Sequence, residues 1–413
     1  MKRKQVIIMI VVAAVLAAVV WLLNRGEQKT WSGGAAASAA GGKVLEFPIN
    51  DVAQITIQTA SGTLNLARKE ETWVVQERGD YPAAFDRVSN LLRSVWALKA
   101  VQEVNAGPSQ FPRFEIADPP QGSAAKLEFK DSGAKQLGAL ILGKKHTRRA
   151  DGAMPGGGEF PTGRYVMQPG GSRVLLVSEM FDAVEAKPES WIDREFIKIE
   201  NPSAIALAGA TDAQKWKLVR ENATAEWKLE GAPETEKPDA AKMTPITGGL
   251  SRMMFADVLG KDANPGETGL ENPTTLTVET FDGFRYVLRI GKPMGDNQPV
   301  SVEVNANFAA ERTPAADEKP EDKARLDAEF SAKQKPLQEK LAREKKLEGR
   351  VFLVAKTTID QVVKERAALL AQPSPSPSPA TPAAPAPPGV TTSPVAAGAG
   401  KGASPTPAAK PKR

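Results

Sequence analysis

The pattern of apolar and polar positions divides the chain into three kinds of sequence. Residues 6–23, from Val6 to Leu23, are apolar without interruption. Between residues 44 and 368, apolar side chains alternate with polar ones or recur every three to four residues, which are the periods of strands and amphipathic helices. From residue 372 onward Pro, Ser, Thr, Ala and Gly dominate. The pattern predicts an apolar helix, a folded region and a disordered tail at residues 369–413.

The first apolar run has the length of a membrane span. Its 18 residues would extend roughly 27 Å as a helix, close to the hydrocarbon thickness of a bilayer. Basic residues that flank a span stay in the cytoplasm, and Lys2, Arg3 and Lys4 precede this one. We expect a cytoplasmic stub and a single-pass inner-membrane anchor at residues 1–25, a flexible spacer at residues 26–43, and the bulk of the chain in the periplasm.

Two other interpretations of this run stay open. A signal peptide would be cleaved within the small residues at 35–40, although a signal core is usually shorter and closer to its cleavage site. A core helix of a soluble domain would also be apolar. The retained anchor fits the length of the run and its basic flank best.

Residues 44–186 predict a first α+β domain. Four apolar residues recur at intervals of three and four and predict one amphipathic helix: Phe85, Val88, Leu92 and Val95. Apolar alternation predicts strands before and after this helix. These strands are expected near residues 47–49, 55–57, 64–68, 73–75, 127–129, 137–142, 165–167 and 174–177. A short helix at residues 181–184 would close the domain.

The same order of elements returns in residues 187–368. Arg-Val-Leu-Leu-Val at residues 173–177 returns as Arg-Val-Phe-Leu-Val at residues 350–354. The helical rhythm also returns, with Asp239 as the expected N-cap, on Met243, Ile246, Leu250 and Met253. The sequence therefore predicts an α+β fold of two similar tandem domains, each an antiparallel sheet with packed helices. The alternative is two unrelated segments that merely share apolar alternation.

The two copies differ where the first has a Gly-rich stretch, at residues 146–163. We expect the second copy to hold a charged helical insertion in the equivalent gap, at residues 311–348. A narrow apolar stripe runs along this insertion: Leu326, Phe330, Leu337 and Leu341. A stripe this thin suits docking onto a partner helix or onto the protein's own surface. The alternative is a solvated insertion with no partner.

Composition limits the chemistry. There is no Cys and one His among the 413 residues, which excludes disulfides, thiolate metal sites and multi-His metal sites. The net charge of +5 comes from the two ends, because subtracting the seven basic residues there leaves −2 for the body. A nucleic-acid-binding domain would carry a basic stripe of its own. We therefore expect no metal, no cofactor, no catalytic residue and no nucleic acid partner.

One local cluster is strongly basic. Lys144, Lys145, His146, Arg148 and Arg149 could together take an anionic group, and an exposed basic loop is the alternative. Gly138 and the Gly143-Lys144 pair have the glycine spacing of a phosphate-binding loop. Lys145 stands where that loop needs Ser or Thr, so we expect Gly143-Lys144 to be a turn at a strand end.

Several short segments resemble a bacterial family that is described only as a domain of unknown function. They are residues 52–57, Trp73, residues 88–98, residues 140–143, residues 269–273 and residues 290–292. The resemblance covers roughly residues 44–366, and it implies a transmembrane helix followed by a tandem α+β region. Members are often encoded beside a gliding-type ABC transport system, which implies an accessory role in an envelope complex. The charged insertion and the Pro-rich tail depart from the family's pattern.

These features together favour a non-catalytic, membrane-anchored accessory or scaffold protein of an envelope ABC-type transport complex. An alternative function is a binding module for a cell-wall polymer or a small envelope ligand, held in the cleft between the two repeats. A third, a carboxylate hydrolase, would require two acids that converge in a pocket. A filled junction between the repeats would favour the scaffold, and an apolar pocket there would favour the binding module.

Overall fold

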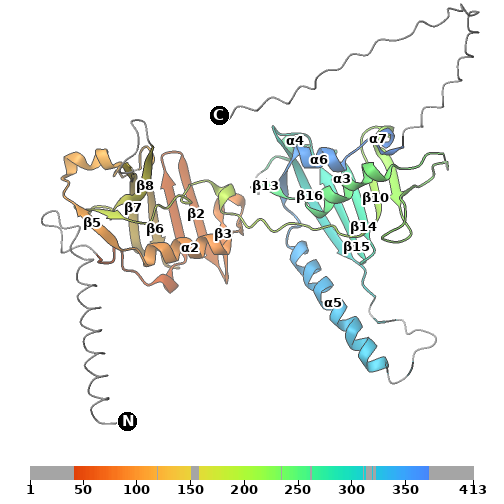
Figure 1. Cartoon of the computed structure of the whole chain (residues 1–413), viewed down its shortest axis with the longest axis horizontal. Helices are drawn as coiled ribbons and strands as arrows, with labels where there is room; N and C mark the ends of the chain where they lie inside the picture. The colour runs from red at the N-terminus through yellow and green to blue at the C-terminus, as the bar shows by residue number, and fades with distance from the viewer. Residues whose placement is uncertain are drawn as a thin grey trace, which may run out of the picture. The chain divides into compact units, whose positions relative to one another are not determined.

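The structure is a computed structural model that describes residues 41–371, except residues 119, 150–157, 234, 261–262, 310, 313–318 and 320–321. The expected anchor at residues 6–23, most of the spacer and all but the start of the tail lie outside the described residues. Within the described part of the chain, no helix is both long and apolar enough to cross a membrane. Two antiparallel sheets with covering helices build the fold, which confirms the α+β class (Figure 1).

The first sheet is built by residues 41–193, here called the first half. Its strand order is β4-β3-β2-β1-β6-β7-β8-β9-β5. The strands are β1 (Gln54–Thr59), β2 (Gly62–Lys69), β3 (Thr72–Val75), β4 (Tyr81–Pro82), β5 (Ala100–Val104), β6 (Ala125–Lys130), β7 (Gln136–Arg149), β8 (Glu159–Met167) and β9 (Val174–Val177). Helix α2 (Phe85–Trp96) buries Val88, Leu91, Leu92 and Val95 against this half. Short 3-10 turns are η1 (Ile49–Asp51), η2 (Gln76–Arg78), η3 (Pro108–Phe114) and η4 (Pro188–Ser190).

The second sheet is built by residues 194–371, here called the second half. Its strand order is β12-β11-β10-β14-β15-β16-β17-β13. The strands are β10 (Pro202–Ala208), β11 (Lys215–Val219), β12 (Lys228–Leu229), β13 (Phe255–Val258), β14 (Thr274–Thr280), β15 (Phe284–Ile290), β16 (Asn297–Ala306) and β17 (Val351–Ala355). The helices are α3 (Ala240–Ser251), α4 (Pro265–Thr268), α5 (Lys323–Lys345), α6 (Lys356–Val362) and α7 (Arg366–Leu369), with the turn η5 (Asp212–Gln214).

The second half repeats the strand order of the first, with β4 as the one described strand that has no counterpart. The register of corresponding strand pairs also agrees between the two halves. Ile55 faces Leu66 across β1 and β2, and Ile205 faces Leu218 across β10 and β11. The edge strands β5 and β13 even share an irregularity, between Ala100 and Gln102 and between Phe255 and Asp257.

Each half is closed by the segment that follows its sheet. The backbone N–H of Ala84, just before α2, donates to the carbonyl of Trp191 at 2.7 Å. The N–H of Asp239, just before α3, donates to the carbonyl of Leu369 at 2.8 Å. Asp239 is also the N-cap of α3, as expected, because its carboxylate accepts from the N–H of Ala241 at 2.9 Å.

Three details differ from the sequence-based expectations. Residues 181–184 form a turn, because Phe181 adopts φ 55° and a helix cannot continue through that conformation. Residues 146–149 and 159–163 belong to the paired strands β7 and β8, so the basic cluster is not on a loop. Gly143 lies inside β7, so the prediction of a turn at Gly143-Lys144 is wrong.

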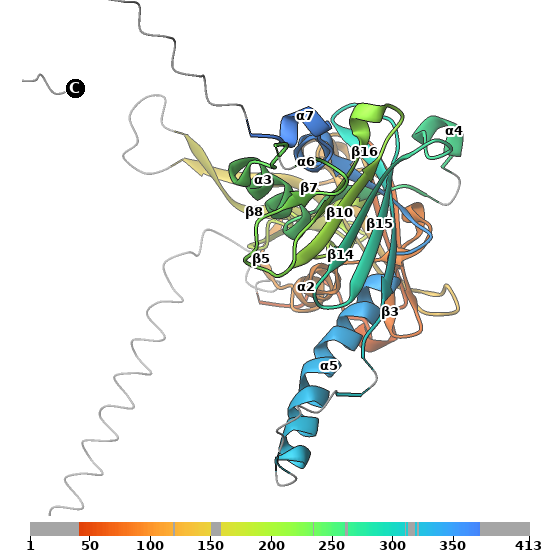
Figure 2. The ribbon, with the colours of Figure 1, turned by 90° about the vertical axis from the view of Figure 1, so that its right-hand side faces the viewer.

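The charged insertion is not in the connection where we expected it. It lies between β16 and β17, and its counterpart in the first half is the short turn between β8 and β9. The predicted connection was wrong because consecutive strands have similar apolar alternation. The sequence therefore does not show which connection between them contains the added residues. Figure 2 shows α5 extending away from its sheet.

Candidate functional site

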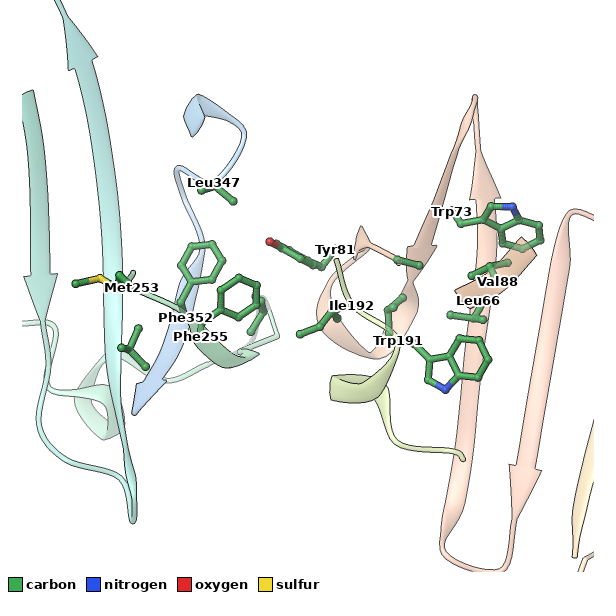
Figure 3. Close-up of a cluster of buried hydrophobic side chains, with 14 of the residues drawn as sticks. Leu66, Trp73, Tyr81, Val88, Trp191, Ile192, Met253, Phe255, Leu347 and Phe352 are labelled. Carbon is green, nitrogen blue, oxygen red and sulfur yellow. The ribbon is translucent and has the colours of Figure 1, made fainter. Parts of the chain in front are cut away.

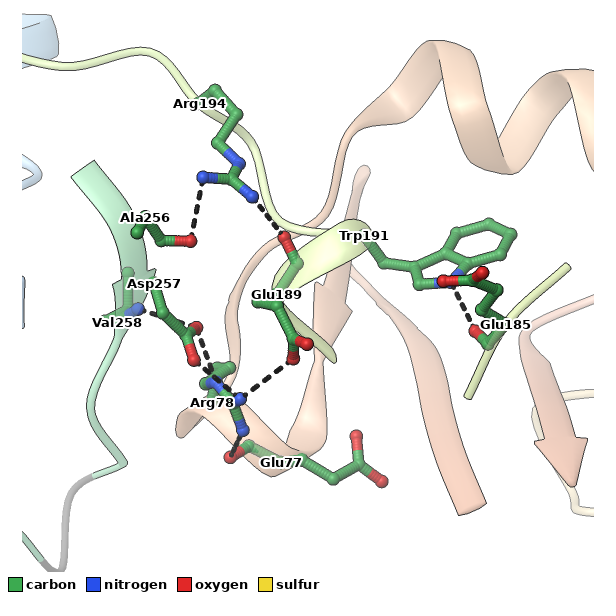
Figure 4. Close-up of polar contacts among 9 residues, drawn as sticks. All are labelled: Glu77, Arg78, Glu185, Glu189, Trp191, Arg194, Ala256, Asp257 and Val258. Atoms are coloured by element: carbon green, nitrogen blue, oxygen red, sulfur yellow. Dashed lines mark hydrogen bonds and ion pairs between the residues drawn. The ribbon is translucent and has the colours of Figure 1, made fainter. Parts of the chain in front are cut away.

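The two halves meet through an ion pair that joins residues far apart in sequence. Arg78 of η2 donates from Nε to Oδ1 and from Nη2 to Oδ2 of Asp257 in β13, both at 2.7 Å (Figure 4). About a fifth of each side chain is exposed. The hydrogen bond with Asp257 raises the pKa of Arg78 above its usual value. Two parallel bonds fix the angle between the groups as well as their distance.

Arg194 makes a second polar bridge at the same place. Its Nη1 donates to the carbonyl of Ala256 at 2.8 Å and its Nη2 to the carbonyl of Glu189 at 2.6 Å (Figure 4). The same Nη1 also donates to the carbonyl of Phe255 at 2.8 Å. These acceptors lie in β13 and in η4. One guanidinium therefore satisfies backbone carbonyls from both halves.

An aromatic cluster fills the space beside these bridges. Tyr81 of the first half meets Phe255 and Phe352 of the second edge-on, with ring centroids 6.0 and 6.1 Å apart (Figure 3). Phe196 packs on the same two rings at 5.0 and 4.8 Å. Burial raises the pKa of Tyr81. The place expected for a ligand cleft is thus occupied by the protein's own side chains.

The arginine of the repeated Arg-Val-x-Leu-Val motif has different surroundings in its two copies, Arg350 and Arg173. In the second half its guanidinium lies 5.1 Å from the ring centre of Tyr81 and donates to the carbonyl of Gly79 at 3.2 Å. Arg173 is its counterpart in the first half, where two thirds of the side chain is exposed and Glu103 is 3.6 Å away. The repeated arginine therefore serves the junction in only one of its two copies.

A large hollow lies within the second half, away from this junction. It encloses about 1500 Å³ between α3, the β11–β12 connection and Ala371. Arg220 forms part of its wall, with its guanidinium 4.7 Å from the ring centre of Trp227 and 5.6 Å from that of Phe281. Burial lowers the pKa of Arg220. The lining mixes both charges with apolar side chains.

The predicted basic cluster is spread along a strand hairpin. Lys145 is ion-paired with Asp182. His146 shares a 2.8 Å hydrogen bond between its Nδ1 and Oγ1 of Thr162 and meets the ring of Tyr165 edge-on. Lys144, Arg148 and Arg149 lie on the same strand, β7. At least two of the five basic residues thus already have partners, and the structure does not bring the set around one point.

The apolar stripe on α5 is divided in two. Leu337 and Leu341 are partly buried and pack against the core of the protein. Leu326 and Phe330 lie on the other part of the helix, among ion pairs such as Lys323 with Asp327 at 2.8 Å. Only half of the stripe therefore docks on the protein's own surface.

A buried polar group holds α5 in place. Glu344 is 2% exposed and accepts from Tyr286 Oη at 2.9 Å and from the N–H of Lys198 at 3.0 Å. Lys340, one turn earlier, lies 3.3 Å from the same carboxylate. Burial, followed by the charge of Glu344, raises the pKa of Tyr286. Sequence reasoning missed Glu344 because one more Glu in a charged helix gives no signal.

The described residues hold no group of three or more His, Asp or Glu side chains that could bind a metal ion. Comparison with known proteins adds one finding. No curated protein and no solved structure matches the chain. Residues 73–273 match a family that is described as a domain of unknown function (DUF4340), and this segment includes both residues of the Arg78–Asp257 pair. By this match residues 73–273 belong to a domain-of-unknown-function family.

Proposed function

We propose that this chain is a non-catalytic, membrane-anchored accessory or scaffold protein of an ABC-type transport complex in the envelope. The observation that carries the proposal is the filled junction, where the Arg78–Asp257 pair and the Tyr81–Phe255 contact join the halves. Directional ion pairs and buried aromatics restrict motion between the parts they join. Two joined sheets present fixed outer surfaces, which is what an accessory subunit needs in order to hold partners.

Helix α5 supports the same proposal. Glu344 and Leu347 fix one end of this region on the second sheet, while the part that carries Leu326 and Phe330 extends away from it. The extending part is held together by ion pairs within the helix, such as Arg325 with Glu329 at 2.6 Å. A helix that is anchored at one end and self-supporting at the other can reach a membrane-protein partner without a change in fold.

Crosslinking and affinity purification of the full chain from native membranes test this function. We expect recovery of an ABC transport component, and we expect Leu326→Ser with Phe330→Ser to reduce that recovery. Leu337→Ser is the matched control, because Leu337 packs on the protein's own core and its loss lowers stability first. Recovery of the chain alone, as a monomer, would contradict the proposal.

The hollow beside α3 favours a second candidate function, the binding of a cell-wall polymer or small envelope ligand. The cleft first expected for that role is filled, but this hollow has the volume for a ligand and an aromatic ring, Trp227, at its wall. Titration with wall fragments while following tryptophan fluorescence tests it. Trp227→Leu should abolish the signal change if Trp227 contacts the ligand, and no saturable change with the unaltered chain would eliminate this function.

A further inference from the structure

The described chain begins beside an exposed apolar and basic surface on the first half. We call this surface the Trp96 patch, and it consists of Lys43, Trp96, Lys99 and Val101. Trp96 is 42% and Val101 46% exposed, whereas most large apolar residues of this half are buried. The ammonium of Lys43 lies 4.1 Å from the ring centre of Trp96. The patch therefore combines an aromatic ring, an aliphatic side chain and two ammonium groups.

The two lysines are placed in an electrostatically unfavourable pair. Lys43 lies opposite Lys99 in an isolated antiparallel bridge. The flanking bonds run from Val44 N to the Leu98 carbonyl and from Ala100 N to the Gly42 carbonyl, so the lysines form the close, non-hydrogen-bonded type of pair. Like charges that face each other in this way destabilise a strand pair. Among the described residues, no carboxylate forms an ion pair with either lysine, so an anionic group from outside would relieve the repulsion.

In the second half, the corresponding edge of the sheet takes part in the junction between the two halves. By register, Ala100 corresponds to Phe255, so Val101 corresponds to Ala256 and Lys99 to Met254. The edge strand β13 contacts the first half through the Arg78–Asp257 pair, and Arg194 links the Ala256 carbonyl of β13 to the Glu189 carbonyl of the first half. Val101 in β5 and its counterpart Ala256 in β13 are both exposed, and Val101 is the larger apolar side chain. One fold element is thus an interface in one copy and an uncovered, differently composed surface in the other.

We propose that the Trp96 patch rests on the anionic surface of the membrane that holds the chain. This inference rests on the proposed anchor at residues 6–23. Only 17 residues separate that segment from Gly41, and Gly41 donates to the carbonyl of Ala100 at the patch itself. A chain of that length reaches at most roughly 60 Å. Trp and Lys side chains favour the headgroup region of a membrane. There the indole ring and the alkyl part of Lys contact acyl chains, while the Lys ammonium contacts phosphate.

Single-cysteine labelling of the full chain tests the proposal, because the chain contains no Cys of its own. Val101→Cys and, as the matched control, Met254→Cys are each labelled with a small fluorophore. Met254 is 73% exposed and corresponds to Lys99, so it lies on the matching edge of the second half. Each protein is reconstituted into phosphatidylcholine–phosphatidylglycerol vesicles that contain a lipid with a nitroxide on its headgroup.

We expect headgroup quenching at Val101→Cys to exceed that at Met254→Cys by about twofold or more, since the patch would lie within the interface. Adding Lys43→Glu and Lys99→Glu, or omitting phosphatidylglycerol, should bring the two sites to equal quenching. Equal quenching of the unaltered patch in anionic vesicles overturns the proposal, and a protein would then be the better occupant of this edge. Circular dichroism of the charge variants checks that the fold is retained.

A wash of the vesicles with alkaline carbonate separates this inference from the function on which it rests. A chain that stays in the vesicles but shows equal quenching at both sites is anchored without resting on its patch, so the inference alone fails. A chain that is washed off has no anchor, so the proposed function and the inference fail together. A retained chain with stronger quenching at Val101→Cys supports both.

Discussion

Arg78 and Asp257 lie 179 residues apart, yet they share two hydrogen bonds of 2.7 Å each. No local pattern in either segment predicts this pair, and it joins two halves that are each complete in strand order. The pair is therefore the most direct means of testing whether the halves act as one body.

We expect Arg78→Ala and Asp257→Ala to couple in a double-mutant cycle by about 1.5–3 kcal/mol, the range for a hydrogen bond to a charged group. Urea unfolding of the two single variants and the double variant measures this energy. Lys69→Ala with Asp80→Ala is the control, because that exposed pair at 2.8 Å should couple by less than about 1 kcal/mol. Coupling near zero for Arg78 and Asp257 would mean that the aromatic cluster alone joins the halves.

Gly143 and Gly291 provide a test of the duplication. A Cβ at Gly143 would lie 2.3 Å from the carbonyl oxygen of Phe114, and one at Gly291 would lie 2.0 Å from that of Thr268. Because a backbone atom cannot rotate away, we expect Gly143→Ala and Gly291→Ala each to cost roughly 2–3 kcal/mol in thermal or urea unfolding. Gly62→Ala is the control, since nothing lies within 4 Å of its Cβ position and its effect should stay within about 0.5 kcal/mol.

The anchoring of α5 depends on Glu344. Glu344→Ala leaves the Tyr286 hydroxyl and the Lys340 ammonium without their carboxylate, so we expect a loss of about 3 kcal/mol. Hydrogen exchange across residues 337–347 should rise at the same time. Glu339→Ala, which removes an exposed partner 4.0 Å from Lys335, should change stability by less than about 0.5 kcal/mol. Similar losses for the two variants would show that the buried carboxylate does not hold the helix.

Alkaline titration reports on burial at three sites. The chain has three Tyr residues, and burial raises the pKa of each of them: Tyr81, Tyr165 and Tyr286. A raised pKa means that the folded state binds the proton more tightly than the unfolded state does. The stability from this effect is complete below the ordinary value of about 10 and is lost progressively as pH rises above it.

Near-ultraviolet absorbance of the folded chain should therefore show little tyrosinate at pH values where the urea-unfolded chain is half ionised. Tyr286→Phe should lessen the loss of stability above that pH, at the cost of one hydrogen bond to Glu344. Ionisation of all three Tyr residues at the ordinary value in the folded chain would contradict the burial that we describe.

Apolar periodicity predicted the parts of the fold that depend on one face being buried. The helix at Phe85–Trp96 and the strand pairs around Ile55 and Ile205 follow directly from it, because each has a core side and a solvent side. The same reasoning failed at Phe181, where one residue with positive φ converts an apolar helical rhythm into a turn. It also failed for the insertion, since periodicity does not identify the connection in which added residues lie.

The candidate site was much harder to predict than the fold. Asp257, Glu344 and Tyr81 are single polar or aromatic residues whose partners come from distant segments, so their spacing in sequence carries no information. One signal did exist. The Arg that is repeated at residues 173 and 350 lies at the junction in one copy, but the sequence alone did not show which copy or that it would lie there.

The closing segment of the first half has a consequence for how the protein can be divided. Trp191 is 1% exposed. Its backbone carbonyl accepts a hydrogen bond from the N–H of Ala84, and its indole N–H donates to the carbonyl of Glu185 at 2.9 Å. A fragment that stops at residue 186 would lose this side chain, whereas one that stops at residue 193 would keep it. Expression boundaries, protease sites and fusion points should therefore fall after Asp193, where the polypeptide has finished one fold and begins the next.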